Sequence, residues 1–431
     1  MRPIPSPNPV RQNGSMAERS KTRQRSVQNR TLVTRGKIAD GALQVLAEKG
    51  VQGLTHRAVA RAAGVGLAAT TYHFDTKSDI IEEASRTLLD GYLAAFRRMA
   101  GRIASGQESR IASLDDLVQR VVLNALNRER IRSLAWSELI LHGGRSAEGR
   151  ALAQSWYGQL DSIWYEIAKL VEPRPSKQKA SAAIDLTVGL TFFLHPLGLD
   201  QPTVKGLLVG KRDAGPLLER FTRSPNGSGD SDNDSDPRTR YAETRARIVQ
   251  ASIDIIVAKG AAGVSYGRVA EIAGMVRSGP SYYFPTIDGL LEMAQMALFD
   301  RAKARYRAGL GSVHSGDIDE NRLLDLTTAI FYREALEFGR ESVGHYSVWI
   351  SAAQHPSLRP AVASSLLDQH RAWMRRITSV FGETPNPSAA MRMQALFIGK
   401  LIRAIAAAVP IEDLSRTRTD FAETLHDGLR H

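Results

Sequence analysis

One sequence feature constrains the fold of this chain more than any other: the sequence repeats itself at a constant offset. Adding 210 to a residue number finds the same residue type again at many positions, and no gap is needed. The repeated residues include Thr34-Arg35 and Thr244-Arg245, Lys49-Gly50 and Lys259-Gly260, Val59-Ala60 and Val269-Ala270, Ala63-Gly64 and Ala273-Gly274, Tyr72 and Tyr282, Phe74 and Phe284, and Gly189 and Gly399. Internal repeats identify the structural unit of a chain. The sequence therefore predicts a tandem duplication.

A polar segment lies between the two copies. It contains Gly, Ser, Asp and Asn from Ser224 to Pro237, without one apolar residue. Such a composition cannot bury a core, so residues 223–240 are predicted to be a solvated linker. Residues 1–30 are rich in Arg, with Pro and Ser, and are predicted to be a disordered basic arm. The arm could enter the minor groove of DNA, or it could be an inert leader.

Each copy begins with the pattern of three short helices. In the first copy an apolar helical face ends at Lys49-Gly50, and Thr55 can cap a second helix over 57–63. Gly64-Val65 makes a tight turn to a third helix at about 67–74, and Thr76-Lys-Ser-Asp79 is a capping box for a fourth. Two short helices joined by a turn that contains Gly are typical of a helix-turn-helix unit.

These residues, at these spacings, resemble the DNA-binding region of the TetR family of bacterial transcriptional regulators. The resemblance rests on Thr34-Arg35-x-x-Ile38, Ala47-Glu48-Lys49-Gly50, Thr55-x-Arg57-x-Val59-Ala60-x-x-Ala63-Gly64-Val65 and Thr71-Tyr72-His73-Phe74-x-x-Lys77-x-Asp79. It implies an all-α protein, a tandem pair of helix-turn-helix units in which each unit is followed by a helical domain. In this family the helical domain usually dimerises and houses an inducer ligand.

The helix after the turn is the one expected to read DNA. Its first turns can reach base edges in the major groove, while flanking residues hold phosphate oxygens. The predicted DNA-binding residues of the first copy are Thr55, Arg57, Leu67, Ala69, Thr70, Thr71, Tyr72, His73 and Lys77. Phe74 is assigned to packing of the small unit, and Tyr72 could pack there as well.

The second copy keeps the turn but changes this helix. Arg277-Ser278-Gly279-Pro280-Ser281 replaces 67–71, and Pro280 is tolerated only in the first turn of a helix. The predicted DNA-binding residues of the second copy are Ser265, Arg268, Arg277, Ser278, Ser281, Tyr282 and Tyr283. We favour a second unit that reads a different half-site; the alternative is a structural partner with weak DNA contact.

About 130 residues of helical pattern follow each unit, and they contain all five tryptophans. Aromatic residues at helical spacing usually pack in a core, whereas the family resemblance implies an apolar ligand pocket. The candidate ligand-binding residues are Trp136, Ile140, Trp164, Trp349 and Trp373. Apolar helices at 183–194 and 394–409 lie where the family builds its dimer bundle, and the two could pair within one chain.

Composition narrows the classes of function. The absence of cysteine excludes disulfides and thiolate metal sites, and no HExxH, Walker or GxSxG motif is present. No enzyme, metal site or cofactor is therefore predicted. The net charge of +12 favours a polyanionic partner, and the basic excess near the first unit favours nucleic acid over a membrane. The apolar stretches 186–199 and 395–409 are interrupted and too short to span a bilayer.

These interpretations divide the chain into six parts. They are an arm (1–30), a helix-turn-helix domain (31–91), a helical regulatory domain (92–222), a linker (223–240), a second helix-turn-helix domain (241–301) and a second regulatory domain (302–431).

The predicted protein is a cytoplasmic, nucleoid-associated transcriptional regulator. It binds a duplex DNA operator as an intrachain pseudo-dimer, and a small apolar effector relieves repression. A further homodimer of chains stays open. The alternatives are a second unit that serves only for pairing, and a helical scaffold or ligand-binding protein without DNA binding.

Overall fold

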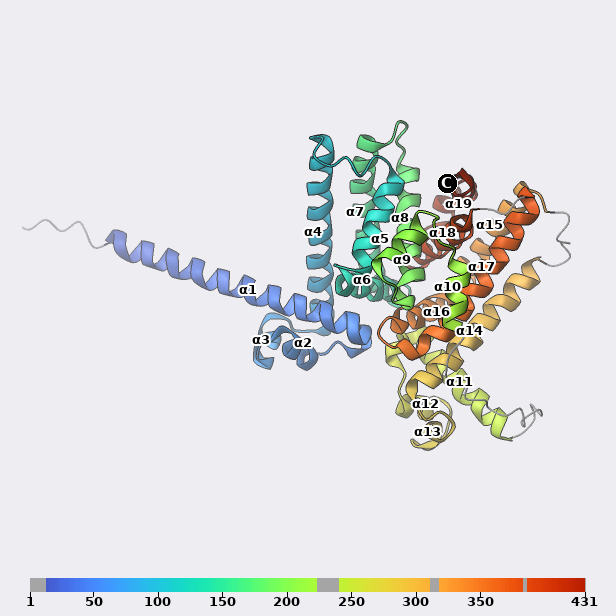
Figure 1. Cartoon of the computed structure of the whole chain (residues 1–431). Helices are drawn as coiled ribbons and strands as arrows, with labels where there is room; N and C mark the ends of the chain where they lie inside the picture. The colour runs from blue at the N-terminus through green and yellow to red at the C-terminus, as the bar shows by residue number, and fades with distance from the viewer. Residues whose placement is uncertain (1–12, 223–239, 311–317, 383–385, 431) are drawn as a thin grey trace, which may run out of the picture.

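The fold is described from a computed structural model, which covers residues 13–222, 240–310, 318–382 and 386–430 (Figure 1). Within these ranges the protein is all-α: it consists of α-helices and short 3-10 helices, and no strand is present. The helices of the first half are α1 (Asn13–Gly53), α2 (His56–Ala63), α3 (Leu67–His73), α4 (Lys77–Ala104), α5 (Leu114–Leu126), α6 (Arg130–Gly143), α7 (Ala147–Val171), α8 (Lys177–Leu194), η1 (His195–Leu197), α9 (Gln201–Leu208) and α10 (Ala214–Thr222). Those of the second half are α11 (Arg240–Lys259), η2 (Ala261–Gly263), α12 (Tyr266–Ile272), α13 (Gly279–Tyr283), α14 (Ile287–Leu310), α15 (Glu320–Leu336), α16 (Gly339–Ala352), η4 (Pro356–Leu358), α17 (Arg359–Phe381), α18 (Pro387–Ala406), η5 (Ile411–Leu414) and α19 (Thr417–Arg430).

The bounds of many helices recur at the same offset as the sequence. The starts of α4 and α14 differ by 210 positions, as do the starts of α8 and α18 and the ends of α7 and α17. Each half places its two short helices, α2 and α3 or α12 and α13, below a bundle of longer ones in the view of Figure 1. The two bundles meet through α8 and α18, which pack against each other.

Two glycines allow α8 and α18 to approach closely. A Cβ atom on Gly189 would lie 1.6 Å from the carbonyl oxygen of Ala395, and one on Gly399 would lie 1.7 Å from that of Asp185. Positions 185 and 395 are also 210 apart, so each helix makes the same backbone contact with the other. Such reciprocity is typical of an isologous interface between two like subunits.

The charges at this crossing are not reciprocal. Asp185 is almost fully buried, and its carboxylate binds Arg403 at 2.5 Å and Lys400 at 3.4 Å, both on α18. Burial would lower the pKa of Arg403, but Asp185 and Asp161 outweigh it and raise that pKa. The second half has Ala395 where the first has Asp185. At this crossing, one buried carboxylate of α8 therefore meets two cations of α18.

The N-terminal helix is longer than the sequence analysis predicted. The backbone is helical from Asn13, so residues 13–30 are not a disordered arm; residues 1–12 lie outside the described part, as does most of the predicted linker, 223–239. The physical reason is that this stretch lacks Pro and contains many Arg, Gln, Lys and Glu residues, which favour helices. Figure 1 shows this part of α1 projecting away from the bundle.

One described segment, Lys177–Leu197, has the length and hydropathy of a membrane span. This differs from the expectation that the apolar stretches are too short, because the helix starts well before residue 186. However, 83% of its apolar window is buried inside the protein. Its apolar side chains face other helices, as expected for the core of a helical bundle.

Candidate nucleic-acid interface and internal pockets

The first unit is a helix-turn-helix with its expected caps. Gly50, at φ 59°, breaks α1, and the Thr55 hydroxyl accepts a hydrogen bond from the Ala58 amide at the start of α2. Gly64 ends α2 in the left-handed conformation, which a residue with a side chain adopts only at a cost. The predicted capping box between Thr76 and Asp79 is present at the start of α4. The sequence-based assignment of these elements is confirmed.

The buried side of this unit holds it to the bundle. Phe74 is buried, and the guanidinium of Arg35 lies 4.8 Å from the centre of its ring. Arg35 also binds Glu83 of α4 at 2.7 Å. Burial would raise the pKa of Glu83, but hydrogen bonds from Arg86 and Arg35 outweigh it and lower that pKa. The orientation of α3 is thus fixed through α1 and α4.

Most predicted DNA-binding residues of the first unit lie on its surface. Tyr72 is 81% exposed, an unusual value for a tyrosine, and its ring meets that of His73 edge-on. The exposed residues are Thr55, Arg57, Leu67, Thr71 and Tyr72, and the half-buried ones are Ala69, His73 and Lys77. Partial burial lowers the pKa of Lys77. These side chains form one polar and aromatic face on α2, α3 and the start of α4.

Thr70 departs from the expectation. Its side chain is fully buried, and its hydroxyl donates a hydrogen bond to the Leu67 carbonyl. The reason is helical geometry: Thr70 lies one turn from Phe74, on the side of α3 that packs inward. Thr70 therefore packs on the inner side of α3. The prediction that it contacts DNA bases is corrected to a packing role.

The second unit repeats this frame at 210 positions further on. Gly274 takes the left-handed conformation, Phe284 is buried, and Arg245 lies 5.1 Å from the centre of its ring. Ser278 precedes α13, and Pro280 lies within its first turn, as the sequence required. α13 has five residues against the seven of α3. The retained residues are therefore those that shape the backbone.

The predicted DNA-binding residues of the second unit are also largely at the surface. Ser265, Arg268, Arg277, Ser278 and Tyr282 are exposed, and Ser281 and Tyr283 are half-buried. Tyr282 is 78% exposed, close to the value of its counterpart Tyr72.

Two arginines of this unit lie against their own domain. Arg268 donates a hydrogen bond to the Gly263 carbonyl at 2.7 Å. The Arg277 side chain lies over Gly267, at the position where the first unit has Arg57. The ring of Tyr283 packs 5.0 Å from that of Tyr241. The second surface therefore presents its cations differently from the first.

Each bundle contains a cavity, partly open to solvent, at an equivalent place. In the first half a cavity of about 230 Å³ lies between α4, α5, α6, α7 and α8. Aromatic residues form part of its wall, and three basic residues line it as well: Tyr92, Phe96, Trp136, Trp156 and Trp164, with Arg98, Arg128 and Arg132. The Trp156 indole donates a hydrogen bond to Ser85 of α4 at 2.9 Å, so this wall is also tied to the helix that follows the helix-turn-helix unit.

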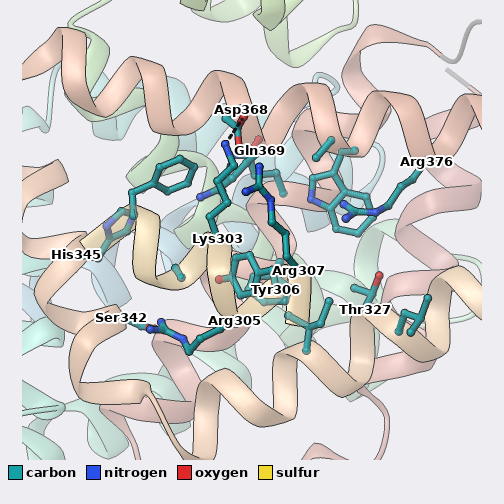
Figure 2. Close-up of a pocket in the computed structure, with 18 of the residues that line it drawn as sticks. Lys303, Arg305, Tyr306, Arg307, Thr327, Ser342, His345, Asp368, Gln369 and Arg376 are labelled. Carbon is teal, nitrogen blue, oxygen red and sulfur yellow. Dashed lines mark hydrogen bonds and ion pairs between the residues drawn. The ribbon is translucent and has the colours of Figure 1, made fainter. Parts of the chain in front are cut away.

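The second half has a cavity of about 220 Å³ between α14, α15, α16, α17 and α18 (Figure 2). Tyr306 and Phe397 contribute apolar surface, but basic side chains line the cavity as well: Lys303, Arg305, Arg307, Arg375 and Arg376. Figure 2 shows Lys303 and Arg307 projecting from α14 toward Asp368 and Gln369. Lys303 binds Asp368 at 3.0 Å.

Three of the five candidate ligand-binding residues line these cavities. Trp136 and Trp164 belong to the first and Trp373 to the second. Ile140 and Trp349 line neither of them and are fully packed, so those two assignments are corrected to core residues. Helical spacing alone could not separate the two groups, because both lie on inward faces.

Sequence reasoning missed the basic lining of the second cavity and the charge pairing at the α8–α18 crossing. A signal for both was present in the repeat. Lys303 and Arg376 stand where the first half has Leu93 and Glu166, and Arg403 stands where it has Phe193. At Leu93 and Phe193 a buried apolar residue of the first half is replaced by a charge, and such a replacement marks a place where the two halves differ in chemistry.

The fold and surface described above define an all-helical protein with a helix-turn-helix unit. Residues 38–84 match the family model for bacterial regulatory proteins of the tetR family. This match supports assignment of the first unit to that family, and it agrees with the resemblance seen in the sequence.

Two curated proteins are similar to part of this chain. The HTH-type transcriptional repressor KstR2 of Rhodococcus jostii is 36% identical over 84 residues, which cover 20% of this chain and 39% of that protein. The HTH-type transcriptional regulator CymR of Pseudomonas putida is 32% identical over 106 residues, which cover 24% and 47%. The chain thus spans less than half the length of these relatives.

One solved structure is also similar. It is the crystal structure of multidrug binding protein EbrR complexed with imidazole, with 27% sequence identity, 41% of this chain and 92% of that chain covered, and a TM-score of 0.30.

Proposed function

We propose that this protein is a cytoplasmic DNA-binding transcriptional regulator that uses both helix-turn-helix units of one chain. The observation that carries the proposal is the surface of α3: a short helix after a glycine turn that presents an almost fully exposed tyrosine in a unit matching the tetR model. A helix held in this way can enter the major groove while flanking residues bind phosphates. The two similar curated proteins are described as HTH-type transcriptional regulators, which supports the same function.

The two units act as a pseudo-dimer that arose by tandem duplication. The common offset of sequence and helix bounds supports this, as does the reciprocal contact of Gly189 and Gly399 at the α8–α18 crossing. Dimeric helix-turn-helix proteins read two half-sites about 34–36 Å apart, or a multiple of that spacing. With unequal reading helices, the preferred operator is asymmetric.

The sites of contact are the exposed residues of the two units. Tyr72 and Tyr282 bind phosphate oxygens or base edges, and Arg57, Lys77 and Arg277 supply positive charge. The first unit has Arg57 where the second has Gly267, and the second unit has Arg277 where the first has Leu67. The two units therefore place their cations at different points along the DNA backbone.

Repression is relieved by a ligand in the helical domains. α4 begins directly after the first unit and lines the first cavity through Tyr92 and Phe96; α14 has the same relation to the second unit and cavity. A ligand that displaces either helix would change the spacing of the two reading helices. Such a shift lowers DNA affinity by as much as the ligand discriminates between the two states.

The test is selection of genomic DNA fragments by the purified protein, followed by mobility shift of the selected duplex at increasing salt. We expect an asymmetric motif and a log affinity that falls linearly with log salt, because bound phosphates release counterions. Protein that selects no motif and shows no salt-dependent shift would favour a helical scaffold without DNA binding. A motif with a single half-site would favour a second unit that serves only for pairing.

A further inference from the structure

The two cavities occupy equivalent places, and basic lining residues outnumber acidic ones in both, by three to one in the first and five to two in the second. The second cavity has five basic lining residues and two acidic ones, Glu341 and Asp368. Asp368 is engaged by Lys303, and Glu341 binds Arg305 at 2.8 Å. The acidic side chains are thus already paired, and basic groups remain in excess.

Arg307, Arg375 and Arg376 are the basic groups left over. Across the described residues, none of the three has a carboxylate within 4 Å, in contrast to Lys303 and Arg305. Arg307 and Arg375 are exposed at the mouth side of the lining. Arg376 is half-buried, and both burial and the neighbouring Arg375 lower its pKa. A guanidinium that loses water without gaining an anion is destabilised, so a bound anion at this place would be favourable.

The deeper part of the cavity offers apolar surface and one unsatisfied acceptor. Tyr306 and Phe397 pack edge-on, with ring centres 6.4 Å apart. Gln394 is 1% exposed and donates a hydrogen bond to Gln369, but its carbonyl oxygen has no hydrogen-bond partner in the described structure. A buried acceptor of this kind normally binds a donor.

Four of the five basic lining residues have no basic counterpart in the first half, whereas Arg307 has Arg97 as its counterpart. Lys303 replaces Leu93, Arg375 replaces Tyr165 and Arg376 replaces Glu166. Two of these three substitutions lie on α17, next to one another. The first cavity has more aromatic lining at the same place in its fold, together with Arg98, Arg128 and Arg132.

We propose that the second cavity binds an amphipathic organic anion, an acidic group on an apolar ring or chain. The acidic group lies against Arg307 and Arg376, the apolar body lies on Tyr306 and Phe397, and a donor on the ligand meets Gln394. This inference rests on the proposed function for the role of the cavity, and it replaces the expected apolar effector by a charged one in this half.

The experiment compares two probes of the same shape, naphthalene-2-carboxylate and its neutral amide. Binding to the full-length protein is measured by calorimetry without DNA. We expect the carboxylate to bind at least about tenfold more tightly than the amide, because a charge-assisted contact of about 1.5 kcal/mol or more is available only to the anion. Equal binding of the two probes overturns the proposal without any variant.

Two variants locate the site. In Arg307→Gln/Arg376→Gln the preference for the carboxylate disappears while the amide still binds, which also shows that the cavity is intact. Arg98→Gln is the matched control, because Arg98 lines the first cavity, and it keeps the preference. A preference that survives in the double variant, or that is lost in the control, contradicts the assignment.

The outcome is separable from that of the proposed function. Calorimetry without DNA tests the anion site alone, and the mobility shift without ligand tests DNA binding alone. If the protein binds DNA in the mobility shift but binds both probes equally, the proposed anion site is contradicted and the proposed function is not. If the protein prefers the carboxylate but does not bind DNA, the proposed function is contradicted and the anion site is not.

Discussion

The two halves of this molecule agree in their backbone frame and disagree in what they present. Gly64 and Gly274 make the same turn, and Arg35 and Arg245 cover the same phenylalanine of their unit. At the surface, by contrast, Arg57 faces solvent where the other half has Gly267. The difference teaches that residues fixing backbone geometry tolerate little change, whereas surface and cavity residues can take new chemistry in one half.

The largest effect is expected from removing the buried carboxylate of Asp185 at the crossing of α8 and α18. Asp185→Ala removes the carboxylate that Arg403 and Lys400 share and leaves each with one partner, Asp161 and Asp420. We expect it to cost about 3–4 kcal/mol of unfolding free energy, the lower part of the range for a broken buried pair. Denaturant unfolding measures the loss. Asp185→Leu combined with Arg403→Met, Lys400→Leu and Asp420→Leu recovers much of it, because no unpaired buried charge remains; Asp161, the other partner of Arg403, is 39% exposed. A neutral effect of the single change would show that the halves do not depend on this pairing.

A second prediction concerns the two glycines that make the same backbone contact at the crossing of α8 and α18. Gly189→Ala and Gly399→Ala each place a Cβ within 2 Å of a carbonyl oxygen, so α8 and α18 must separate. We expect each to cost about 3 kcal/mol, at the upper end for overpacked cores. Gly158→Ala on α7 is the control, because a Cβ there has nothing within 4 Å, and it stabilises by up to about 1 kcal/mol. Unequal costs at 189 and 399 would argue against reciprocal packing.

The two reading surfaces are compared by removing one tyrosine from each. Tyr72→Ala and Tyr282→Ala each remove an exposed ring, so stability is unchanged, and each lowers operator affinity about tenfold when that unit contacts DNA. Mobility shift on the selected duplex measures the loss. Leu170→Ala, at an exposed position of α7, is the control. Loss with Tyr72→Ala alone would mark the second unit as a structural partner.

The smallest expected effect is a pH dependence of stability that comes from His345, at a position where the first half has no histidine. Burial, with a contribution from Arg305, lowers the pKa of His345 to about 3, and the first half has Ala135 there. Because the unfolded chain takes up this proton near pH 6.5 and the folded protein does not, stability falls as the pH drops below 6.5.

His345→Gln removes about 0.7 kcal/mol of that fall between pH 7 and pH 6. Denaturant unfolding at both pH values measures it. His355→Gln is the control, because that side chain is 48% exposed. An unchanged pH dependence in His345→Gln would show that this histidine titrates normally in the folded protein.

Much of the frame could be predicted from the sequence, because local rules determine it. Thr55, Gly64, and the pair Thr76 and Asp79 act through neighbours a few residues away, and each behaves as expected. Thr70 and Trp349 were misassigned because burial depends on which helix packs against them. The partners of Asp185, more than 200 positions away, follow only from the packing of α8 on α18.

The crossing of α8 and α18 also bears on how the protein responds to dilution. Two separate subunits dissociate as their concentration falls, and occupancy of a paired site then drops more steeply than in proportion. Here both helices belong to one polypeptide, so their association is intramolecular and its extent does not depend on concentration. A cell with only a few copies of this chain would still hold every one of them in the paired state.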